Sequence, residues 1–276
     1  MEKFGFQKAI QLLSDIGYDC LDLSLFSKKG KLLLDDPGYQ EKAHKLKKIA
    51  DDAGISFNQS HTPFPCYIPG DEEYNRTTYL YQLRSLEISS IVGAKYVVIH
   101  PTALEKDQIS FNREYYSRLA DYSLNFYTRI AVENMFAWDK EKDHAVANVC
   151  SRGEDFLLFM EEMKIENLVA CVDVGHAPLV GDTASSIIET LGSRYVKSLH
   201  IHDNDEHSDM HTLPFLQSAD WRRIMGALKN IGYTGELTLE ADRFLLGFPD
   251  DMLPAAGEFM LKTARRLAKM FEESGF

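Results

Sequence analysis

The sequence contains only four cysteines among its 276 residues, and no two of them form a C-x-x-C pair. It has no apolar run approaching the roughly 18 residues that cross a bilayer, and it does not open with the basic-then-apolar order of a secretion signal. Cysteines in such a chain are expected to stay reduced. We therefore expect no disulfides, no membrane span and a cytoplasmic location. The cysteines are Cys20, Cys66, Cys150 and Cys171.

Positive charge is also scarce. The chain has 30 lysines and arginines against 42 aspartates and glutamates, which gives a net charge of −12 and an isoelectric point near 5.2. Such a balance repels polyanions unless a local basic cleft or bound cations reverse the field, so extended nucleic-acid contact is disfavoured. No G-x-G-x-x-G phosphate loop follows the early apolar runs, which disfavours an open nucleotide-binding sheet.

One phrase recurs along the chain, in which an amphipathic helical pattern ends at a glycine and a β-rich run follows. The glycines of this phrase are Gly17, Gly54, Gly93 and Gly232. Glycine closes a helix by adopting the left-handed conformation that other residues avoid. The phrase predicts repeated helix-to-strand joints.

Apolar, β-branched runs predict seven buried parallel strands, and helical periodicity fills the intervals between them. We predict strands near 20–25, 55–60, 96–100, 130–133, 168–173, 196–202 and 236–240. We predict helices at 39–53, 71–92, 112–128, 154–164, 220–230 and 255–273. An eighth strand would have to lie within residues 1–6, before a helix that begins near Gln7. The alternation indicates an α/β protein, and the length suits a (β/α)8 barrel, or TIM barrel, of about 250 residues. With no linker dividing the chain, residues 1–276 are expected to form a single domain.

Six successive predicted strands end in a side chain that can bind a metal. These residues are His61, His100, Glu133, Asp173, His200 and Glu240. The carboxyl ends of barrel strands meet on one face, where loops build the active site. Two local motifs, Asp173-Val-Gly-His176 and Asp209-Met-His211, add further ligands. Carboxylate and imidazole without thiolate suit Zn²⁺, Mn²⁺, Co²⁺ or Fe²⁺, and the ligand types do not decide which metal is loaded.

A structural role competes with a functional one at each of these positions. A single histidine at a strand end, such as His61 or His100, is more often a hydrogen-bonded structural residue. Glu133 and Glu240 differ, because they close buried-looking runs where an unpaired carboxylate costs several kcal/mol. We expect these two to need a cation. His202 shares a strand face with His200 if the strand stays regular, and a role beside the site is equally compatible with the pattern.

In their order and spacing, the phrases that contain these residues resemble the xylose isomerase-like barrels, a superfamily of sugar isomerases, ketohexose epimerases, inosose dehydratases and endonuclease IV-type repair enzymes. The phrases are HTPF at 61–64, IHP at 99–101, VENM at 132–135, DVGHA at 173–177, LHIHDND at 199–205, DMH at 209–211 and LEAD at 239–242. The resemblance runs from about residue 7 to the C-terminus.

The resemblance to the epimerases and isomerases implies one divalent metal held by four residues. These are Glu133, Asp173, His200 and Glu240. It also implies that Glu133 and Glu240 are catalytic, one removing a proton beside the carbonyl and the other returning it. The chemistry agrees, because a Lewis-acid metal polarises substrate oxygens while paired carboxylates act as base and acid. The expected reaction is isomerisation or epimerisation of a sugar, sugar phosphate or polyol, with an inosose dehydratase-like lyase as an alternative.

A second alternative is an endonuclease IV-type phosphodiesterase with a three-metal cluster, whose nine ligand types all find matches here. The additional ligands, of metal or of substrate, would be His61, His100, His176, Asp209 and His211. The site is thus expected to bind one to three ions, with Mg²⁺ also among the candidates. The short acidic stretch between His200 and Asp209 offers no basic loop for phosphates, which favours a small sugar or polyol partner over DNA.

Aromatic residues beside the motif phrases could cover the C–H face of a sugar, or simply pack under the loops. They are Phe64, Phe136, Trp138, Phe215 and Trp221. We take Phe64, Trp138 and Arg243 as the substrate-binding candidates, Arg243 because it could pair with a phosphate or carboxylate. A non-catalytic sugar-binding barrel is disfavoured because it would not need so many buried charges. Assembly into a homo-oligomer is compatible with the sequence.

Overall fold

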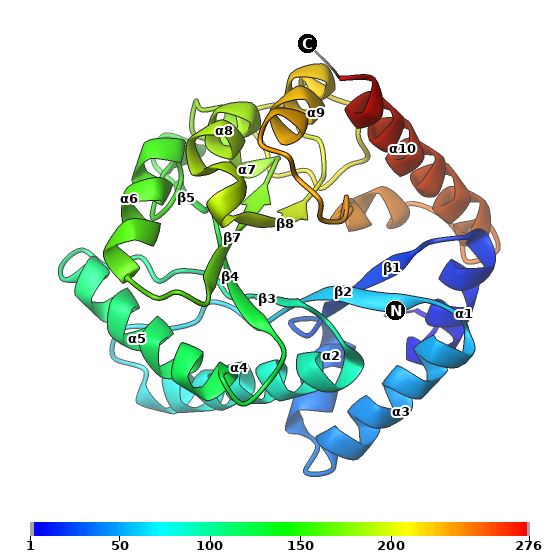
Figure 1. The fold of residues 1–276 in the computed structure, drawn as a ribbon, viewed down its shortest axis with the longest axis horizontal. Helices are drawn as coiled ribbons and strands as arrows, with labels where there is room; N and C mark the ends of the chain where they lie inside the picture. Colours follow the sequence, from blue (N-terminus) through cyan, green and yellow to red (C-terminus); the bar gives the residue numbers. More distant parts are fainter. Residues whose placement is uncertain (1–2, 275–276) are drawn as a thin grey trace. The chain divides into compact units, whose positions relative to one another are not determined.

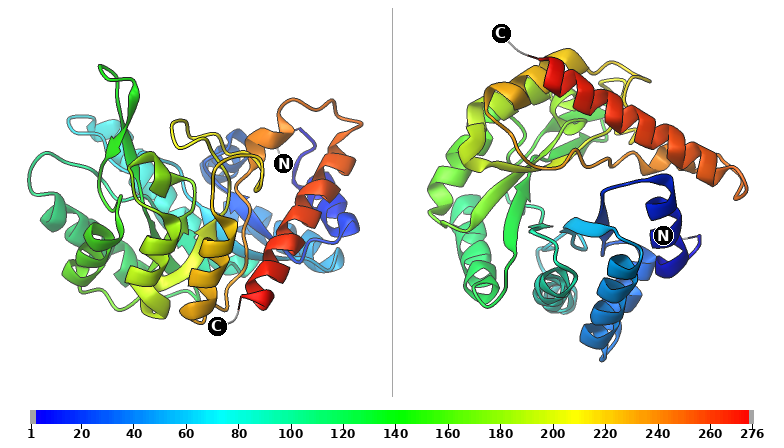
Figure 2. Two further views of the ribbon diagram at one scale, coloured as in Figure 1. Left: turned by 90° about the horizontal axis from the view of Figure 1, so that it is seen from above. Right: turned by 45° about the vertical axis from the view of Figure 1, so that its right-hand side comes forward.

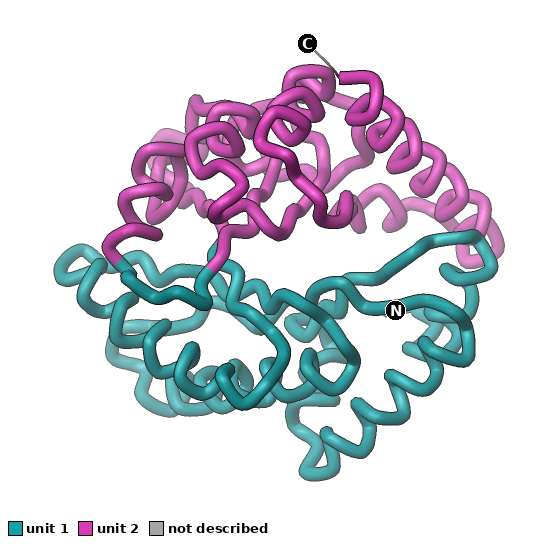
Figure 3. The backbone as a smooth tube through the Cα atoms, in the orientation of Figure 1, with its two compact units in different colours: residues 1–132, 163–168 teal, residues 133–162, 169–276 magenta. Residues whose placement is uncertain are grey.

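The structure of the protein, a computed structural model, describes residues 3–274. The chain divides into two compact units, coloured teal and magenta in Figure 3. Unit 1 comprises residues 1–132 and 163–168, and unit 2 comprises residues 133–162 and 169–276.

Helices and parallel strands alternate in unit 1 (Figure 1). Its strands pair in the order β1-β2-β3-β4, each parallel to the next. The strands are β1 (Cys20–Ser24), β2 (Ser56–His61), β3 (Tyr96–Val98) and β4 (Arg129–Glu133, of which Glu133 belongs to unit 2). The helices are α1 (Phe6–Ile16), α2 (Lys28–Asp35), α3 (Tyr39–Asp52), α4 (Glu72–Val92) and α5 (Gln108–Ser123).

The register of unit 1 decides which strand ends lie together. Ser24 pairs with His61, and His61 pairs with Val98, two residues before His100. The core beneath is formed by leucines and isoleucines of the strands and of α1 to α4, among them Leu23 and Ile88, which are fully buried. Burial of such side chains contributes about 1.5–3 kcal/mol each, so the apolar strand faces fix the sheet and leave their polar last residues at one edge.

Unit 2 combines a parallel strand pair, an antiparallel hairpin and five α-helices. Its strands are β5 (Phe136–Asp139), β6 (His144–Ala147), β7 (Leu168–Asp173) and β8 (Val196–His200), where β7 begins one residue before the unit boundary. Its helices are α6 (Gly153–Met163), α7 (His176–Leu179), α8 (Ala184–Tyr195), α9 (Trp221–Asn230), the 3-10 helix η1 (Asp242–Leu245) and α10 (Leu253–Glu273). Figure 2 shows the β5–β6 hairpin projecting from the unit, and α9 and α10 lying side by side.

The glycine phrase gives the predicted helix ends. Gly17 closes α1 with a φ of 104°, and Gly93 closes α4 with a φ of 87°. Gly54 and Gly232 also have positive φ. After each of these glycines the chain continues as a strand or an extended segment, as the sequence predicted.

Six of the seven predicted strands are confirmed, and the one at 236–240 is wrong. There the chain forms a single bridge, between Leu239 and Ile201. The amides of Ile201 and Glu240 still make the hydrogen bonds of a parallel pair, to Thr238 O and Ile201 O. The bridge lies one residue beyond the end of β8, so the pairing at this edge is too short to form a strand.

The proposed strand at the N-terminus is wrong where the structure describes it. Residues 1 and 2 lie outside the described residues. Lys3 and Phe4 form a turn, Gly5 takes a positive φ of 75°, and Phe6 already begins α1. The predicted helix at 112–128 runs instead from Gln108 to Ser123.

Several elements have no counterpart in the sequence prediction, namely α2, α7, α8, η1 and the β5–β6 hairpin. The hairpin strands are short and partly exposed, so they lack the apolar run that marks a buried strand. The four cysteines are free, as predicted. None of the helices within residues 3–274 combines the length and apolar content needed to cross a membrane.

Candidate metal centre

Unit 2 gathers four of the predicted ligands at the ends of its strands. Glu133 ends β4, Asp173 ends β7 and His200 ends β8, while Glu240 follows the Leu239 bridge. The register of β7 and β8 places Asp173 directly opposite His200. One potential ligand atom from each of the four side chains lies within 4.8 Å of the other three.

His200 lies at the middle of this group. Its Nδ1 atom is 2.9 Å from Glu133 Oε1 and 3.1 Å from Glu240 Oε2. Asp173 Oδ2 is 4.0 Å away. Glu133, Asp173 and His200 are almost completely buried. Three carboxylates therefore crowd around one imidazole in a region of low dielectric.

The electrostatics of this group follow from burial and crowding. Burial raises the pKa of Glu240 well above its ordinary value, and repulsion from Glu133 and Asp173 adds to this against the opposing attraction of His200. Burial opposes the charged form of His200, yet the Cys171 thiol and the glutamates raise its pKa. Because removing a carboxylate from water costs several kcal/mol unless a cation or hydrogen bonds compensate, this donor set fits a divalent cation.

A second group lies in the same unit. It contains His176, His202, Asp209 and His211, whose potential ligand atoms also lie within 4.8 Å of one another. Asp209 Oδ2 is 2.9 Å from His211 Nε2, while Asp209 Oδ1 lies 4.0 Å from His176 Nε2 and 3.8 Å from His202 Nε2. Among the described residues, the buried Oδ1 atom accepts no hydrogen bond. A buried acceptor facing imidazoles fits a cation or a substrate hydroxyl.

Backbone carbonyls orient two of these imidazoles. His176 Nδ1 lies 2.8 Å from Asn134 O, and His211 Nδ1 lies 2.9 Å from Glu240 O. A carbonyl only accepts, so each Nδ1 carries a proton and each Nε2 is directed at the group. His211 Nε2 also donates, to Asp209 Oδ2. Such outer contacts commonly orient histidine ligands of metals. Both Nε2 atoms therefore face the group, where each would bind a cation only after losing any proton it carries.

Unit 1 brings together its own predicted residues. His100 Nε2 lies 3.0 Å from His61 Nε2, and His61 Nδ1 lies 2.9 Å from Thr62 O. Since His61 donates from Nδ1, its Nε2 accepts from His100. Phe64 stacks on His100 with ring centroids 4.6 Å apart, and 43% of Phe64 is exposed. The assignment of His61, His100 and Phe64 to ligand or substrate binding remains a prediction.

The other substrate-binding candidates lie in unit 2. Trp138, on β5, is 41% exposed and meets His207 edge to face with centroids 5.7 Å apart. Arg243 Nη1 donates to Asp209 O at 2.6 Å, so its guanidinium holds the segment that carries Asp209 and His211. Phe136 contacts His176 with ring centroids 5.0 Å apart. The hairpin therefore places Phe136 against the second group and Trp138 against His207.

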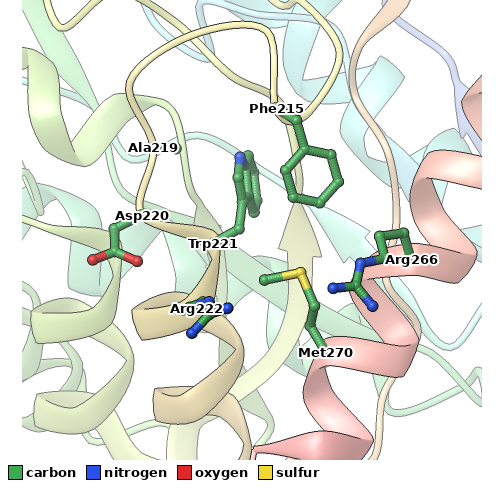
Figure 4. A pocket seen from close by; sticks show the side chains of 7 residues that line it. All are labelled: Phe215, Ala219, Asp220, Trp221, Arg222, Arg266 and Met270. Carbon is green, nitrogen blue, oxygen red and sulfur yellow. The ribbon is translucent and has the colours of Figure 1, made fainter.

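Phe215 and Trp221 line a different feature, a hollow of about 460 Å³ (Figure 4). Its remaining lining residues are Ala219, Asp220, Arg222, Arg266 and Met270. Trp221 Nε1 donates to Asp203 Oδ2 at 3.3 Å, and the same buried carboxylate accepts from the amides of Gln217 and Ala219. Asp203 therefore holds the loop that leads into α9, and these two aromatics take their place from that loop.

Two polar residues near the first group received no firm role from the sequence. Asn134 exchanges two hydrogen bonds with the backbone of Asp173, at 2.7 Å from the amide and 2.9 Å to the carbonyl. His202 is fully buried and lies against Asp173. In the sequence, only their position suggested a role at the site, since each lies one or two residues beyond a predicted ligand.

The chain matches a known protein family along most of its length. The profile of a family described as xylose isomerase-like TIM barrel matches residues 10–263. An uncharacterized protein of Sinorhizobium fredii is 37% identical over 78 residues, which is 28% of this chain and 25% of that protein. An uncharacterized protein of Methanocaldococcus jannaschii is 22% identical over 191 residues, 65% of this chain and 62% of that protein. The matches thus span less than two thirds of either relative.

Solved structures share the fold at low sequence identity. D-psicose 3-epimerase from Clostridium cellulolyticum with D-tagatose superposes with a TM-score of 0.74 at 15% identity, covering 96% of this chain and 94% of that one. A xylose isomerase domain protein from Alicyclobacillus acidocaldarius gives 0.74 at 16% identity, covering 99% and 96%. The IolI protein with a bound zinc atom gives 0.70 at 15% identity, covering 98% and 94%. The predicted TIM-barrel fold is confirmed.

Proposed function

Because the chain belongs to the xylose isomerase-like TIM barrel family, we propose that it is a divalent-metal-dependent isomerase or epimerase of a small sugar, sugar phosphate or polyol. One observation carries the proposal: Glu133 and Glu240 both approach His200 Nδ1, at 2.9 and 3.1 Å, with Asp173 beside them. Paired carboxylates around one cation-binding position are what proton transfer next to a carbonyl requires. The sugar epimerases and the zinc-containing IolI protein among the structural neighbours support it.

Glu133, Asp173, His200 and Glu240 would hold the metal. A bound divalent cation supplies a Lewis acid that polarises the carbonyl and hydroxyl oxygens of the substrate. One glutamate removes the proton from the carbon beside the carbonyl. The other returns a proton to the opposite face, which inverts that carbon, or to the neighbouring carbon, which moves the carbonyl.

Burial serves this chemistry in two ways. Burial and the neighbouring carboxylates raise the pKa of Glu240, which favours its protonated form and suits a group that returns a proton to the substrate. Asp173 differs: burial opposes its ionisation, but the charges of His176 and His202 and the His202 hydrogen bond lower its pKa. Asp173 is therefore suited to stay ionised as a ligand while Glu240 exchanges a proton. Carboxylates with divergent pKa values mark such a division of roles.

Solvent-deuterium exchange tests the proposal. Wild-type protein, stripped of metal and reloaded with Mn²⁺ or Co²⁺, is incubated in D₂O with D-fructose, D-psicose and D-tagatose, and deuterium at carbon is followed by NMR. We expect exchange, and a loss of about 100- to 10,000-fold in Glu133→Gln and in Glu240→Gln. Glu236→Gln, at an exposed glutamate near Glu240, is the matched control. Retained exchange in both catalytic variants would contradict the assignment.

The second group of unit 2 favours one further candidate, a multinuclear phosphodiesterase of the endonuclease IV type. Its residues His176, His202, Asp209 and His211 offer a second cation position, and two or more metals can clamp the attacking and leaving oxygens of a phosphodiester. Elemental analysis of protein purified without chelator separates the two. Two or three metals per chain, with incision of abasic DNA that Asp209→Ala abolishes, would replace the sugar hypothesis.

A dehydratase shares the first proton removal with the proposed reaction. It would expel a hydroxyl group instead of returning the proton, so mass spectrometry of the products would show the loss of water. Products that keep the mass of the substrate support isomerisation or epimerisation.

A further inference from the structure

The ring of His202 occupies the space that a side chain at position 175 would fill. A Cβ atom added to Gly175 would lie 1.9 Å from Cε1 of His202 and 2.5 Å from both ring nitrogens. Gly175 has φ −79° and ψ −27°, a conformation that any residue adopts. Space, not backbone conformation, therefore requires glycine here.

The imidazole enclosed in this way holds the carboxylate of Asp173. His202 Nε2 lies 3.0 Å from Oδ1 and 3.2 Å from Oδ2 of Asp173, and both residues are fully buried. A carboxylate only accepts, so Nε2 carries the donated proton. The amide of His176 donates to the same Oδ1 atom at 2.8 Å. The Asp173 carboxylate thus accepts hydrogen bonds from two donors, the His202 ring and the His176 amide.

A second residue, His211, packs against the ring of His202. The ring of His211 stacks on it with centroids 4.3 Å apart and planes inclined by 3°. Gly175 and His211 therefore both confine the ring, whose Nε2–H is directed at Asp173. A buried, confined donor can set the orientation of a carboxylate more narrowly than water could.

We propose that His202 is a positioning residue that orients Asp173 for cation binding, and that Gly175 is part of the same device because only glycine leaves room for the ring. The inference rests on the proposed role of Asp173 as a metal ligand. It competes with a direct role of His202 as a ligand in the second group. An Nε2 that donates to Asp173 cannot at the same time bind a cation through that atom.

Co²⁺ binding to the metal-free protein tests this inference without turnover, by calorimetry and by the visible absorption of the bound ion. His202→Phe keeps a ring beside His211 but removes the donor. We expect it to weaken Co²⁺ affinity at the tightest site by about 10- to 100-fold and to alter the visible spectrum, with the number of bound ions unchanged. His202→Gln, which retains an N–H donor, is expected to recover part of the affinity.

Gly175→Ala should weaken Co²⁺ binding in the same direction, because the added methyl displaces the ring. In a His202→Ala background the same substitution should have little further effect, since the clashing ring is gone. Gly226→Ala is the control, because its added Cβ meets nothing within 4 Å. Thermal unfolding of each metal-free variant identifies any that fail to fold, and the Gly175–His202 coupling is then measured from the unfolding free energies of the folded ones.

Wild-type affinity and spectrum in His202→Phe would overturn the inference. So would the loss of one bound ion with the tightest site unaffected, because that result makes His202 a ligand of the second group. Wild-type protein that binds no Co²⁺ contradicts both this inference and the metal-dependent function. If Co²⁺ binds and the Gly175–His202 coupling is found, but no sugar exchanges deuterium, the proposed function is contradicted and this inference stands.

Discussion

The imidazole rings of His202 and His211 lie face to face, with centroids 4.3 Å apart and planes inclined by 3°. His211 is anchored at both nitrogens, to Glu240 O and to Asp209 Oδ2, each at 2.9 Å. Burial opposes its charged form, but the Asp209 hydrogen bond and nearby carboxylates raise the pKa of His211 to about 10. The stack therefore connects the carboxylate that His202 holds with the segment that carries Glu240, so the two groups of unit 2 are mechanically linked.

Metal removal should lower the stability of the protein. A ligand that binds only the folded state stabilises it by about 2.7 kcal/mol when its free concentration is about 100-fold above Kd. We expect the Tm to fall on dialysis against a chelator and to recover when Co²⁺ or Mn²⁺ is added, as measured by calorimetry. Glu240→Gln should show a much smaller shift. An unchanged Tm in wild-type protein would argue against a resident metal.

Replacing Trp138 tests the role of the hairpin in substrate binding. Aromatic faces contribute about 0.5–1.5 kcal/mol beyond their buried area, so Trp138→Ala should raise KM by roughly 2- to 10-fold with little change in kcat. Trp138→Phe retains a ring and should lie closer to wild type. Steady-state kinetics on the substrate found by deuterium exchange provide the measurement. An equal KM in all three proteins would remove Trp138 from the binding site.

The stability of unit 1 should depend on pH through Glu87, which lies on α4. Its carboxylate accepts hydrogen bonds from Tyr39 and Gln40, each at 2.7 Å, and from Tyr122. Partial burial opposes ionisation, but these hydrogen bonds outweigh it and lower the pKa of the carboxyl group. The stabilisation is therefore present above the unfolded pKa of about 4.3 and is lost as pH falls through the folded value.

Glu87→Gln provides the comparison for that pH dependence. Urea unfolding between pH 7 and pH 3 should show a steeper loss of unfolding free energy in wild type than in the variant. Burial and the carboxylate of Glu87 also raise the pKa of Tyr39 to about 12. The stabilisation that the neutral Tyr39 contributes to folding is therefore complete below about pH 10 and declines as pH rises towards 12. Parallel curves for the two proteins on the acid side would contradict the assignment.

A side chain at position 30 should destabilise the protein. A Cβ atom there would lie 2.5 Å from Leu25 Cα and 2.5 Å from Ser24 O, both backbone atoms that cannot move without shifting the end of β1. We expect Gly30→Ala to destabilise the protein by about 1–3 kcal/mol in urea unfolding, even though alanine favours helices. Gly226→Ala, within α9 and unobstructed, should be neutral or stabilising. Equal stability of the two variants would contradict this close packing.

Much of the fold was predictable because local chemistry and tertiary structure agree there. Gly17 and Gly93 ended their helices as expected, since few other residues adopt the left-handed conformation. The predicted strand at 168–173 matches β7, all of whose residues are buried. The hairpin of β5 and β6 was not predictable, because two short, partly exposed strands stabilise each other without an apolar run.

The failed strand at 236–240 has a different cause. Its sequence has the apolar pattern of a strand, but a strand also requires continuous pairing, and here the segment pairs only through the Leu239–Ile201 bridge. Phe215 and Trp221 likewise lie beside the motif phrases in sequence. In the structure they line the hollow of Figure 4, where Trp221 donates a hydrogen bond to Asp203. Neither the missing strand at 236–240 nor the position of these two aromatic residues could be inferred from the neighbouring sequence.

The sequence by itself determined the alternation of helix and strand and the residue types at the strand ends, because periodicity and composition are local properties. The strand ends offered six candidate ligands, and the resemblance to the sugar epimerases and isomerases singled out Glu133, Asp173, His200 and Glu240 among them. Only the tertiary structure decided that His200 Nδ1 lies within 3.1 Å of both glutamates, and that His202 turns its Nε2 to Asp173. These contacts depend on strand register and on the space left by Gly175, which are set by packing between segments far apart in the chain.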